Sequence, residues 1–325
     1  ECYVRGVEIS AVQHAMNLYY DDRESFLAEC QGETEDAAAA EGQKRTVEEI
    51  QGRVNRDPRG MVPPWATELV CYIDNHATLL YSVVLALADG FTGAIVDYGT
   101  YPPTGRGHFK MSEIRNGLQT IYPNMAPEDY LPIALDAYTQ LLLGRDWPVA
   151  GGGVIHISCC PIDANWGQVT DSIYEFCRIS RFKGLVIPSH GRYVGAAHAP
   201  WEKFRPKRGE KLGWHWSMPP VGRRVVRHML IDTNHWKTHI HSRFSLPPGT
   251  RGSYSLWGDD PDTHQMFAEH CCAEAVTRTA GHGRTLDEWK ETPGMDNHLG
   301  DCLCGASAAG SYRGIKMFGQ FARSS

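Results

Sequence analysis

The sequence lacks any apolar run of the roughly 18–20 residues that a helix needs to cross a bilayer. The longest apolar run lies near Leu79–Ala88, and Ser82 interrupts it. No signal peptide is recognisable. These absences predict a protein that works away from membranes. The chain opens with Glu1 and no initiator methionine, so we expect a fragment or a processed product.

Cysteine is too sparse for a disulfide framework, since the 325 residues contain ten. Four of the ten form the adjacent pairs Cys159-Cys160 and Cys271-Cys272, which suit small buried positions better than bridges. No C-x-x-C occurs, and the C-x-C at 302–304 is too tight for the usual zinc knuckle. A reduced, cytoplasmic setting is the simpler expectation.

Two motifs of nucleotide and metal chemistry are also missing. The phosphate-binding pattern G-x-x-x-x-G-K-[ST] does not occur, and the glycines at 151–153 lack the lysine and hydroxyl residue that the pattern requires. H-E-x-x-H is absent as well. A histidine-rich zinc site stays a rival hypothesis, because His235, His239 and His241 include an i, i+4 pair.

Charge is unevenly distributed, although the net charge is only −6. Residues 178–251 carry fifteen lysines and arginines against three acidic residues, which gives this segment +12 and leaves −18 for the rest. Aromatic residues such as Trp201 and Trp236 alternate with the charges. The pattern predicts a surface for a polyanion, with a solvated charged surface as the alternative. The candidate DNA contacts are Lys183, Arg205, Lys207, Arg208, Arg223, Arg224 and Lys237.

The first 65 residues read as a lead-in to a larger unit. Residues 32–43 are of low complexity and predict a mobile linker. A capping box at 46–49 predicts a short helix after it. We therefore divide the sequence into residues 1–65, a helical lead-in with a flexible linker, and residues 66–325, one α/β domain with a basic insertion around 190–222.

From residue 67 the apolar periodicity predicts three short strands, then alternating helices and strands, then a closing helix. The expected strands are 67–74, 78–88, 92–98, 154–160, 184–187 and 224–231, and the expected helices are 129–143, 168–179, 233–244, 264–278 and 296–312. Residues 191–221 show no periodicity. This order fits a ribonuclease H-like α/β fold, with a mixed central sheet, the first three strands antiparallel, and helices on both faces.

Three aspartates each stand where an apolar run gives way to polar residues. Asp74 follows the run at 69–73, Asp163 follows the run at 154–162, and Asp301 lies at the start of the apolar final helix. A carboxylate beside a core is costly unless a cation or hydrogen bonds compensate it. We expect the three to converge on one site, although Asp163 also fits a simple turn.

Carboxylates are the ligands that Mg²⁺ and Mn²⁺ prefer. Phosphodiester hydrolysis needs a nucleophilic water, a stabilised phosphorane and a stabilised leaving oxygen, and two such ions about 3.5–4 Å apart supply all three. We expect Asp74, on the most rigid strand, to bridge two ions, with Asp163 and Asp301 each completing one. Gly300 is expected to loosen the helix that carries Asp301.

His298 would share a helix face with the last aspartate, three residues later, and would ligate the second ion or orient that aspartate. A histidine bonded to backbone is the equal alternative. Asp296 is expected to cap the same helix. Asp97, at an apparent turn, and Asp232, as a helix cap, are weaker site candidates.

Four short motifs in one order and spacing resemble a known family. They read DNHATLLY at 74–81, FTGAIVDYGTYP at 91–102, HGRTLDEWK at 282–290 and DNHLGDC at 296–302. Together they resemble the nuclease half of GpA-type phage terminase large subunits, over about residues 18–314.

The resemblance implies a metal-dependent endonuclease that cuts concatemeric viral double-stranded DNA during genome packaging, in the host cytoplasm. It implies that Asp74, Asp163 and Asp301 bind two Mg²⁺ or Mn²⁺ ions, and that His298 takes part as in some relatives. A terminase ATPase domain, a small terminase subunit and a portal are implied partners. No ATPase motif occurs here, so residues 1–65 would be the remnant of that connection and 66–325 the nuclease domain.

Two alternatives stay open. The protein would be another ribonuclease H-like enzyme, such as a junction resolvase or an RNA–DNA hybrid nuclease, or it would be a DNA-binding or assembly module that is silent as a nuclease in isolation.

Overall fold

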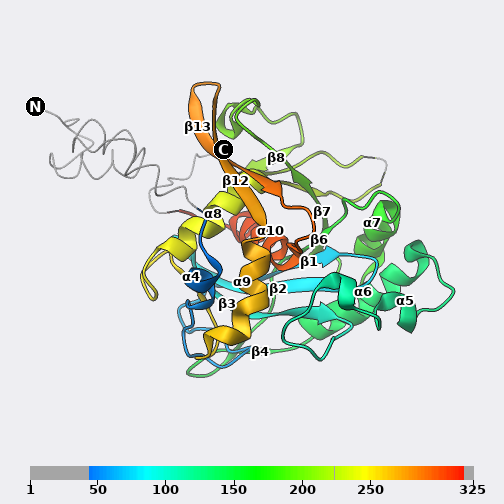
Figure 1. The fold of residues 1–325 in the computed structure, drawn as a ribbon. Helices are drawn as coiled ribbons and strands as arrows, with labels where there is room; N and C mark the ends of the chain where they lie inside the picture. Colours follow the sequence, from blue (N-terminus) through cyan, green and yellow to red (C-terminus); the bar gives the residue numbers. More distant parts are fainter. Residues whose placement is uncertain (1–43, 223, 318–325) are drawn as a thin grey trace, which may run out of the picture. The chain divides into compact units, whose positions relative to one another are not determined.

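The computed structural model describes residues 44–222 and 224–317. Lys44–Lys316 form one compact unit built on a nine-stranded sheet (Figure 1). The packed region thus begins earlier than the predicted boundary at residue 66. The predicted lead-in helix and linker before residue 44 lie outside the described residues, and the domain division stays a prediction. No helix in the described ranges is long and apolar enough to cross a membrane.

The first half of the sheet is the predicted antiparallel meander. It consists of β1 (Glu68–Asn75), β2 (Leu80–Ala88) and β3 (Thr92–Tyr101), with β2 hydrogen-bonded to both neighbours. Gly90 has a φ of 79°, which suits glycine in the turn between β2 and β3. Asp97 lies within β3, so the expected turn at that position is wrong.

Three strands in the second half of the sheet run parallel to β1, and the crossover between the first two of them contains a helix at residues 170–179. The three strands are β6 (Cys160–Asp163), β7 (Val186–Arg192) and β10 (Met229–Asp232). The segment expected to lack regular structure adds the edge strands β8 (Lys211–Gly213) and β9 (Trp216–Met218), and β11 (Tyr254–Leu256) pairs with β3 at the other edge. The strand order is β11-β3-β2-β1-β6-β7-β10-β9-β8.

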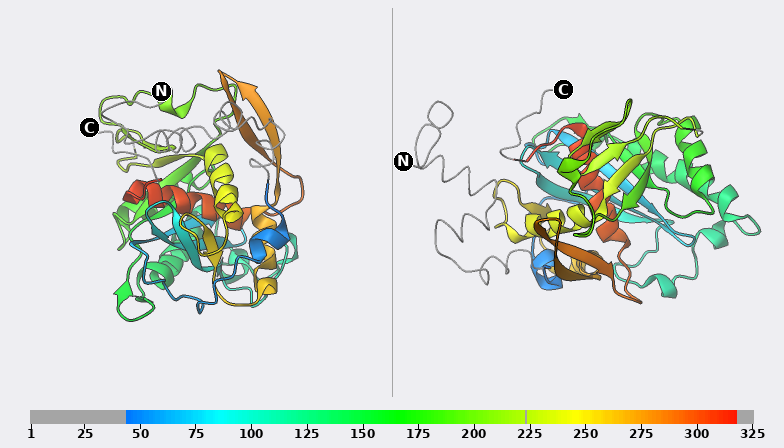
Figure 2. Two further views of the ribbon diagram at one scale, coloured as in Figure 1. Left: turned by 90° about the vertical axis from the view of Figure 1, so that its left-hand side faces the viewer. Right: turned by 90° about the horizontal axis from the view of Figure 1, so that it is seen from above.

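Helices cover both faces of this sheet (Figures 1 and 2). On one face lie α6 (Pro127–Leu143) and α7 (Thr170–Ile179), which pack against each other. On the other face α10 (His298–Arg313) crosses β1 and β2 and also contacts α8 (Thr233–Ser245) and α9 (Gln265–Cys271).

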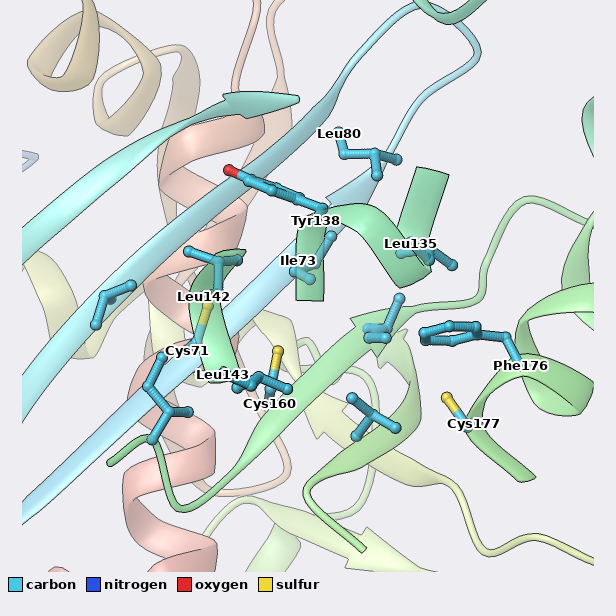
Figure 3. Close-up of a cluster of buried hydrophobic side chains, with 14 of the residues drawn as sticks. Cys71, Ile73, Leu80, Leu135, Tyr138, Leu142, Leu143, Cys160, Phe176 and Cys177 are labelled. Carbon is cyan, nitrogen blue, oxygen red and sulfur yellow. The ribbon is translucent and has the colours of Figure 1, made fainter. Parts of the chain in front are cut away.

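A hydrophobic core lies between the sheet and the α6–α7 layer (Figure 3). Cys71 and Ile73 project from β1 toward Leu135 and Tyr138 of α6, and all four side chains are buried. Successive side chains of a strand point to opposite faces, so Tyr72 and Asp74 point to the α10 side. The eight cysteines within the described ranges are free and buried.

Close approach of α10 to its neighbours depends on glycine. A Cβ on Gly305 would lie 2.0 Å from Cδ2 of Tyr72, and a Cβ on Gly300 would lie 2.7 Å from the carbonyl oxygen of His270 in α9. Because both positions admit no side chain, they fix the depth at which α10 sits on β1 and α9. Gly300 therefore serves close packing in a continuous helix, in place of the loosening that we expected.

Two predicted elements are wrong. The apolar run at 154–160 divides into β5 (Val154–Ile155), which pairs with β4 (Trp147–Pro148), and an irregular segment before β6. The helix expected over 264–278 ends at Cys271, and the chain continues as a ribbon of β12 (Glu274–Gly281) and β13 (Arg284–Glu291). The apolar spacing in this stretch fits both a helix and a strand. Residues 282 and 283 both have a positive φ, and they form the turn that joins the two strands of the ribbon.

The predicted capping box is confirmed at α4 (Val47–Gln51). The Glu49 backbone N–H donates to the Thr46 hydroxyl, and the Glu49 carboxylate accepts from the Thr46 backbone N–H. Ile50 anchors α4 in the core with no exposed surface. The remaining short elements are η2 (Met111–Glu113), α5 (Leu118–Ile121), η3 (Trp201–Lys203) and η4 (Pro261–His264).

Candidate active site

The structure brings the three predicted aspartates to one cavity of about 290 Å³. Asp74 is near the end of β1, and Asp163 is the last residue of β6. These strands are parallel neighbours in which Ile73 pairs with Ile162, so the two aspartates follow in adjacent positions. Asp301 enters from the first turn of α10 above β1.

His298 forms a hydrogen bond with Asp74. Its Nδ1 lies 2.7 Å from Oδ2 of Asp74, and its ring stacks on Tyr81 with centroids 4.6 Å apart. Burial lowers the pKa of His298, but the hydrogen bond to Asp74 and the negative charge there outweigh it and leave the pKa raised. His298 does not line the cavity, so in this arrangement it orients a site carboxylate from behind.

The cavity disfavours the ionised form of two of its carboxyl groups. Burial and the neighbouring Asp74 raise the pKa of Asp163 to about 8, although the backbone N–H of Asn165 donates to its carboxylate. Burial also raises the pKa of Asp301 to about 6; the Lys237 ammonium opposes this shift, and Glu274 reinforces it. Perturbed carboxyl groups in one cavity are typical of a functional site.

Lys237 is the cation of this cavity. Its Nζ lies 3.2 Å from Oδ1 of Asp301 and also contacts the buried carboxylate of Glu274. Burial lowers the pKa of Lys237, but Asp301 and Glu274 more than compensate and raise it, so the side chain is charged at neutral pH. We expected Lys237 on a DNA-binding surface; it lies instead beside the predicted catalytic carboxylates.

The donor chemistry of the cavity fits a hard divalent cation. Four carboxylates line one cavity, the three predicted aspartates and Glu291, and two of the aspartates have raised pKa values that a bound cation would reverse. As the side chains stand, no three His, Cys, Asp or Glu residues of the described chain form a group that could hold a metal ion. Lys237 offsets part of the negative charge in this arrangement.

The two weaker candidates and Asp296 lie outside the cavity. Asp97 pairs with Arg59 at 2.7 Å, and Asp232 caps α8 as expected by accepting from the backbone N–H of His235. Asp296 does not cap α10, because the cap residue is Asn297 and the Asp296 carboxylate accepts from the backbone N–H of Met111 instead.

The histidines of the rival zinc hypothesis are not arranged as ligands. His241 accepts from the backbone N–H of Arg45 through Nδ1, and its Nε2 contacts the Cys271 carbonyl. His235 stacks flat on His215 with centroids 3.4 Å apart. In the part of the chain that the structure describes, these histidines belong to no group of three or more His, Cys, Asp or Glu side chains that could hold a metal ion.

Several residues of the cavity were missed by sequence reasoning. Asn165, Tyr193 and Thr233 line it, and Glu291 reaches it from the end of β13. Asn165 carries a weak sequence signal, since it follows Asp163 by two residues. The buried ion pair of Glu274 with Lys237 had no recognisable signal in the sequence, because we expected residue 274 inside a helix.

The predicted DNA contacts are dispersed. Lys183, Arg205, Lys207 and Arg208 are exposed, outside the cavity. Arg224 is held by Asp171, with Nε 2.6 Å from Oδ1. Arg223 lies outside the described residues.

Comparison with known proteins gives one family. The family described as terminase large subunit gpA, endonuclease domain, matches residues 21–320. This range contains all four motif segments noted in the sequence. No curated protein and no solved structure gives a match.

Proposed function

Because the chain belongs to the gpA endonuclease-domain family of terminase large subunits, we propose that it hydrolyses phosphodiester bonds of double-stranded DNA and cuts concatemeric viral DNA during genome packaging. The observation that carries this proposal is the shared cavity of Asp74, Asp163 and Asp301, which come from three distant parts of the sequence. The terminase ATPase domain, the small terminase subunit and the portal are partners proposed from the family.

We further propose that the fold is ribonuclease H-like. The order β3-β2-β1-β6-β7 supports this, because an antiparallel meander leads into parallel strands whose ends meet at one edge. The three acids lie on the first strand of the meander, on the first parallel strand beside it, and on the closing helix.

In this proposal Asp74, Asp163 and Asp301 hold two Mg²⁺ or Mn²⁺ ions. Bound divalent ions would supply an activated water and stabilise charge on the phosphorane and the leaving oxygen. His298 orients Asp74 through their hydrogen bond, and Lys237 holds Asp301 in position. Such supporting contacts to metal ligands commonly decide affinity and activity.

The exposed basic side chains at 183 and 205–208 are proposed to contact the DNA backbone. Contacts between cations and phosphates release counterions, so the affinity should fall steeply with salt. Phosphate contacts of this type position DNA without reading its sequence, which fits an enzyme with little sequence preference.

Plasmid nicking in Mn²⁺ tests the proposal. Wild-type protein should cut supercoiled plasmid, and Asp74→Ala should not. Asp97→Ala is the matched control, because Asp97 lies in the same meander but pairs with Arg59 away from the cavity. Cleavage that survives Asp74→Ala would contradict the site, a preference for branched or hybrid substrates would favour the resolvase or hybrid-nuclease class, and DNA binding without cleavage would favour an assembly module.

Metal binding can be tested without cleavage. A ligand that binds only the folded state raises the unfolding temperature. Mn²⁺ should therefore raise the melting temperature of the wild type and of Asp97→Ala, and should have a much smaller effect on Asp74→Ala. Equal shifts in all three proteins would place the ion elsewhere.

A further inference from the structure

A second cavity, of about 530 Å³, opens beside α7 and the segment that leads into β10. Its wall combines a cation with apolar and aromatic groups. The polar and aromatic part comes from Arg224, the Asp171 carboxylate, Tyr174 and His228, and the apolar part comes from Pro220 and Val226.

Arg224 is held in place at this cavity. Its Nε donates to Oδ1 of Asp171 at 2.6 Å, and its guanidinium lies 4.6 Å from the ring centroid of Tyr174. A guanidinium carries five N–H donors, so the pairing with Asp171 does not exhaust its capacity to bind an anion. The Arg224 side chain is partly exposed, which leaves its guanidinium accessible to a phosphate.

A chain of hydrogen bonds joins this cavity to the catalytic one. Asn165 lines the catalytic cavity, and its Oδ1 lies 3.0 Å from Nδ1 of His190. Nε2 of His190 lies 3.0 Å from the hydroxyl of Tyr174, and the ring of His228 lies 5.3 Å from that of His190. The two cavities therefore lie on either side of one short relay from β6 to α7.

The relay is suited to a fixed geometry. Burial lowers the pKa of His190 to about 4 and also lowers the pKa of His228, so both rings are neutral near pH 7. A neutral His190 with the proton on Nδ1 donates to Asn165 and accepts from the Tyr174 hydroxyl. Both ring nitrogens of His190 are then hydrogen-bonded, and the ring holds Asn165 and Tyr174 at a constant distance from each other.

We propose that the second cavity binds a nucleotide unit flanking the scissile phosphodiester, with a phosphate at Arg224 and the sugar and base against Pro220 and Val226. The proposal rests on the proposed nuclease function. A cationic group that takes phosphate beside an apolar wall that takes a base is the combination found in nucleic-acid grooves. Because the relay fixes the spacing between the cavities, a bound flanking unit would set the register of the strand at Asp74 and Asp163.

The test is a double-mutant cycle that measures whether the Arg224 side chain and one DNA phosphate contribute to binding affinity through the same contact. Duplex oligonucleotides short enough to occupy both cavities in one register carry a single neutral methylphosphonate at successive positions, and affinity is measured by fluorescence anisotropy in an Asp74→Asn background that prevents cutting. Arg224→Gln should weaken binding of the unmodified duplex about tenfold, as expected for a charged hydrogen bond. At one flanking position the methylphosphonate should produce a similar loss with Arg224 present and no added loss with Arg224→Gln.

Arg227→Gln is the matched control, since Arg227 belongs to the same segment but donates to the Gly209 carbonyl and does not line the cavity. It should show independent losses at every methylphosphonate position. Additive losses for Arg224→Gln at all positions, or the same coupling for Arg227→Gln, would overturn the subsite. Coupling at a flanking phosphate in a protein that never nicks plasmid would keep the subsite and reject the nuclease function. If free thymidine 5′-monophosphate weakened duplex binding but no methylphosphonate position depended on Arg224, the cavity would be a mononucleotide site and the proposal would be overturned.

Discussion

Nδ1 of His298 lies 2.7 Å from Oδ2 of Asp74, and the two residues are 224 positions apart in the chain. The contact joins the first turn of α10 to the end of β1. It places a partly buried histidine behind the carboxylate that we propose as the shared metal ligand. We therefore propose that His298 positions Asp74, where the sequence had suggested a ligand or a partner of Asp301.

His298→Ala should reduce plasmid nicking about 10–100-fold, the range found when partners of metal ligands are removed. The Mn²⁺ concentration for half-maximal activity should rise, because Asp74 loses its orientation. His298→Asn is the conservative comparison, since its amide can still donate to Asp74, and it should retain more activity. An unchanged metal requirement in His298→Ala would remove the positioning role.

Asp163→Asn should stabilise the metal-free protein while it abolishes nicking. The folded-state pKa of Asp163 is raised to about 8, so between pH 4 and pH 8 the folded state holds a proton that the unfolded chain releases, and stability falls as pH rises. The amide removes this loss, and we expect a gain of about 0.5–2 kcal/mol at pH 8. The gain should shrink toward pH 4. Chemical denaturation measures it, with the exposed turn variant Asp89→Asn as the reference.

Lys237→Met should destabilise the metal-free fold by about 3–5 kcal/mol, because it leaves Glu274 and Asp301 buried without their cation. Adding Glu274→Gln to Lys237→Met should recover part of the loss. Urea denaturation of the two single variants and the double variant gives the coupling. Strictly additive losses would show that the buried pair is not the source.

Gly305→Ala should cost about 1–3 kcal/mol, because the new methyl group meets the Tyr72 ring at 2.0 Å in a packed layer. Gly310→Ala is the matched control in the same helix. Its methyl group would clash with Cδ1 at the tip of Leu87, at 2.2 Å, which a rotamer change can relieve, and its other neighbours lie at 3.6 Å or more. Thermal denaturation should rank the two variants in that order. Equal losses would indicate that general helix repacking, and not the Tyr72 contact, sets the cost.

His241 should make stability depend on acid. Burial lowers its folded-state pKa to about 3, so as pH falls from about 6.5 toward 3 the unfolded chain takes up a proton that the folded state excludes. The free energy of unfolding should fall by about 1.4 kcal/mol per pH unit for each such proton. In His241→Gln the free energy of unfolding should fall less steeply with pH, by about 1.4 kcal/mol per pH unit, because one proton fewer is taken up on unfolding. The same slope in both proteins between pH 6 and pH 4 would contradict the burial of a neutral ring.

Local patterns predicted the elements whose periodicity was strong. The meander of β1, β2 and β3, the helices α6 and α8, and the closing helix follow from apolar spacing and turn residues. The ribbon at 274–291 could not be predicted in this way, because the spacing over Glu274–Arg278 fits both a strand and a helix. The side chains that hold the ribbon also belong to distant parts of the chain. Asn234 of α8, for example, donates to the Asp287 carbonyl and accepts from the Trp289 backbone N–H.

The sequence by itself determined that Asp74, Asp163 and Asp301 would stand at the border of apolar segments, because local hydrophobicity and carboxylate desolvation are properties of the chain. Only the tertiary structure decided what surrounds them. Pairing of β1 with β6 and the depth of α10 set by Gly305 bring the three to one cavity. The same packing delivers His298 to Asp74 and Lys237 to Asp301, since contacts between residues so far apart depend on helix position and not on any local pattern.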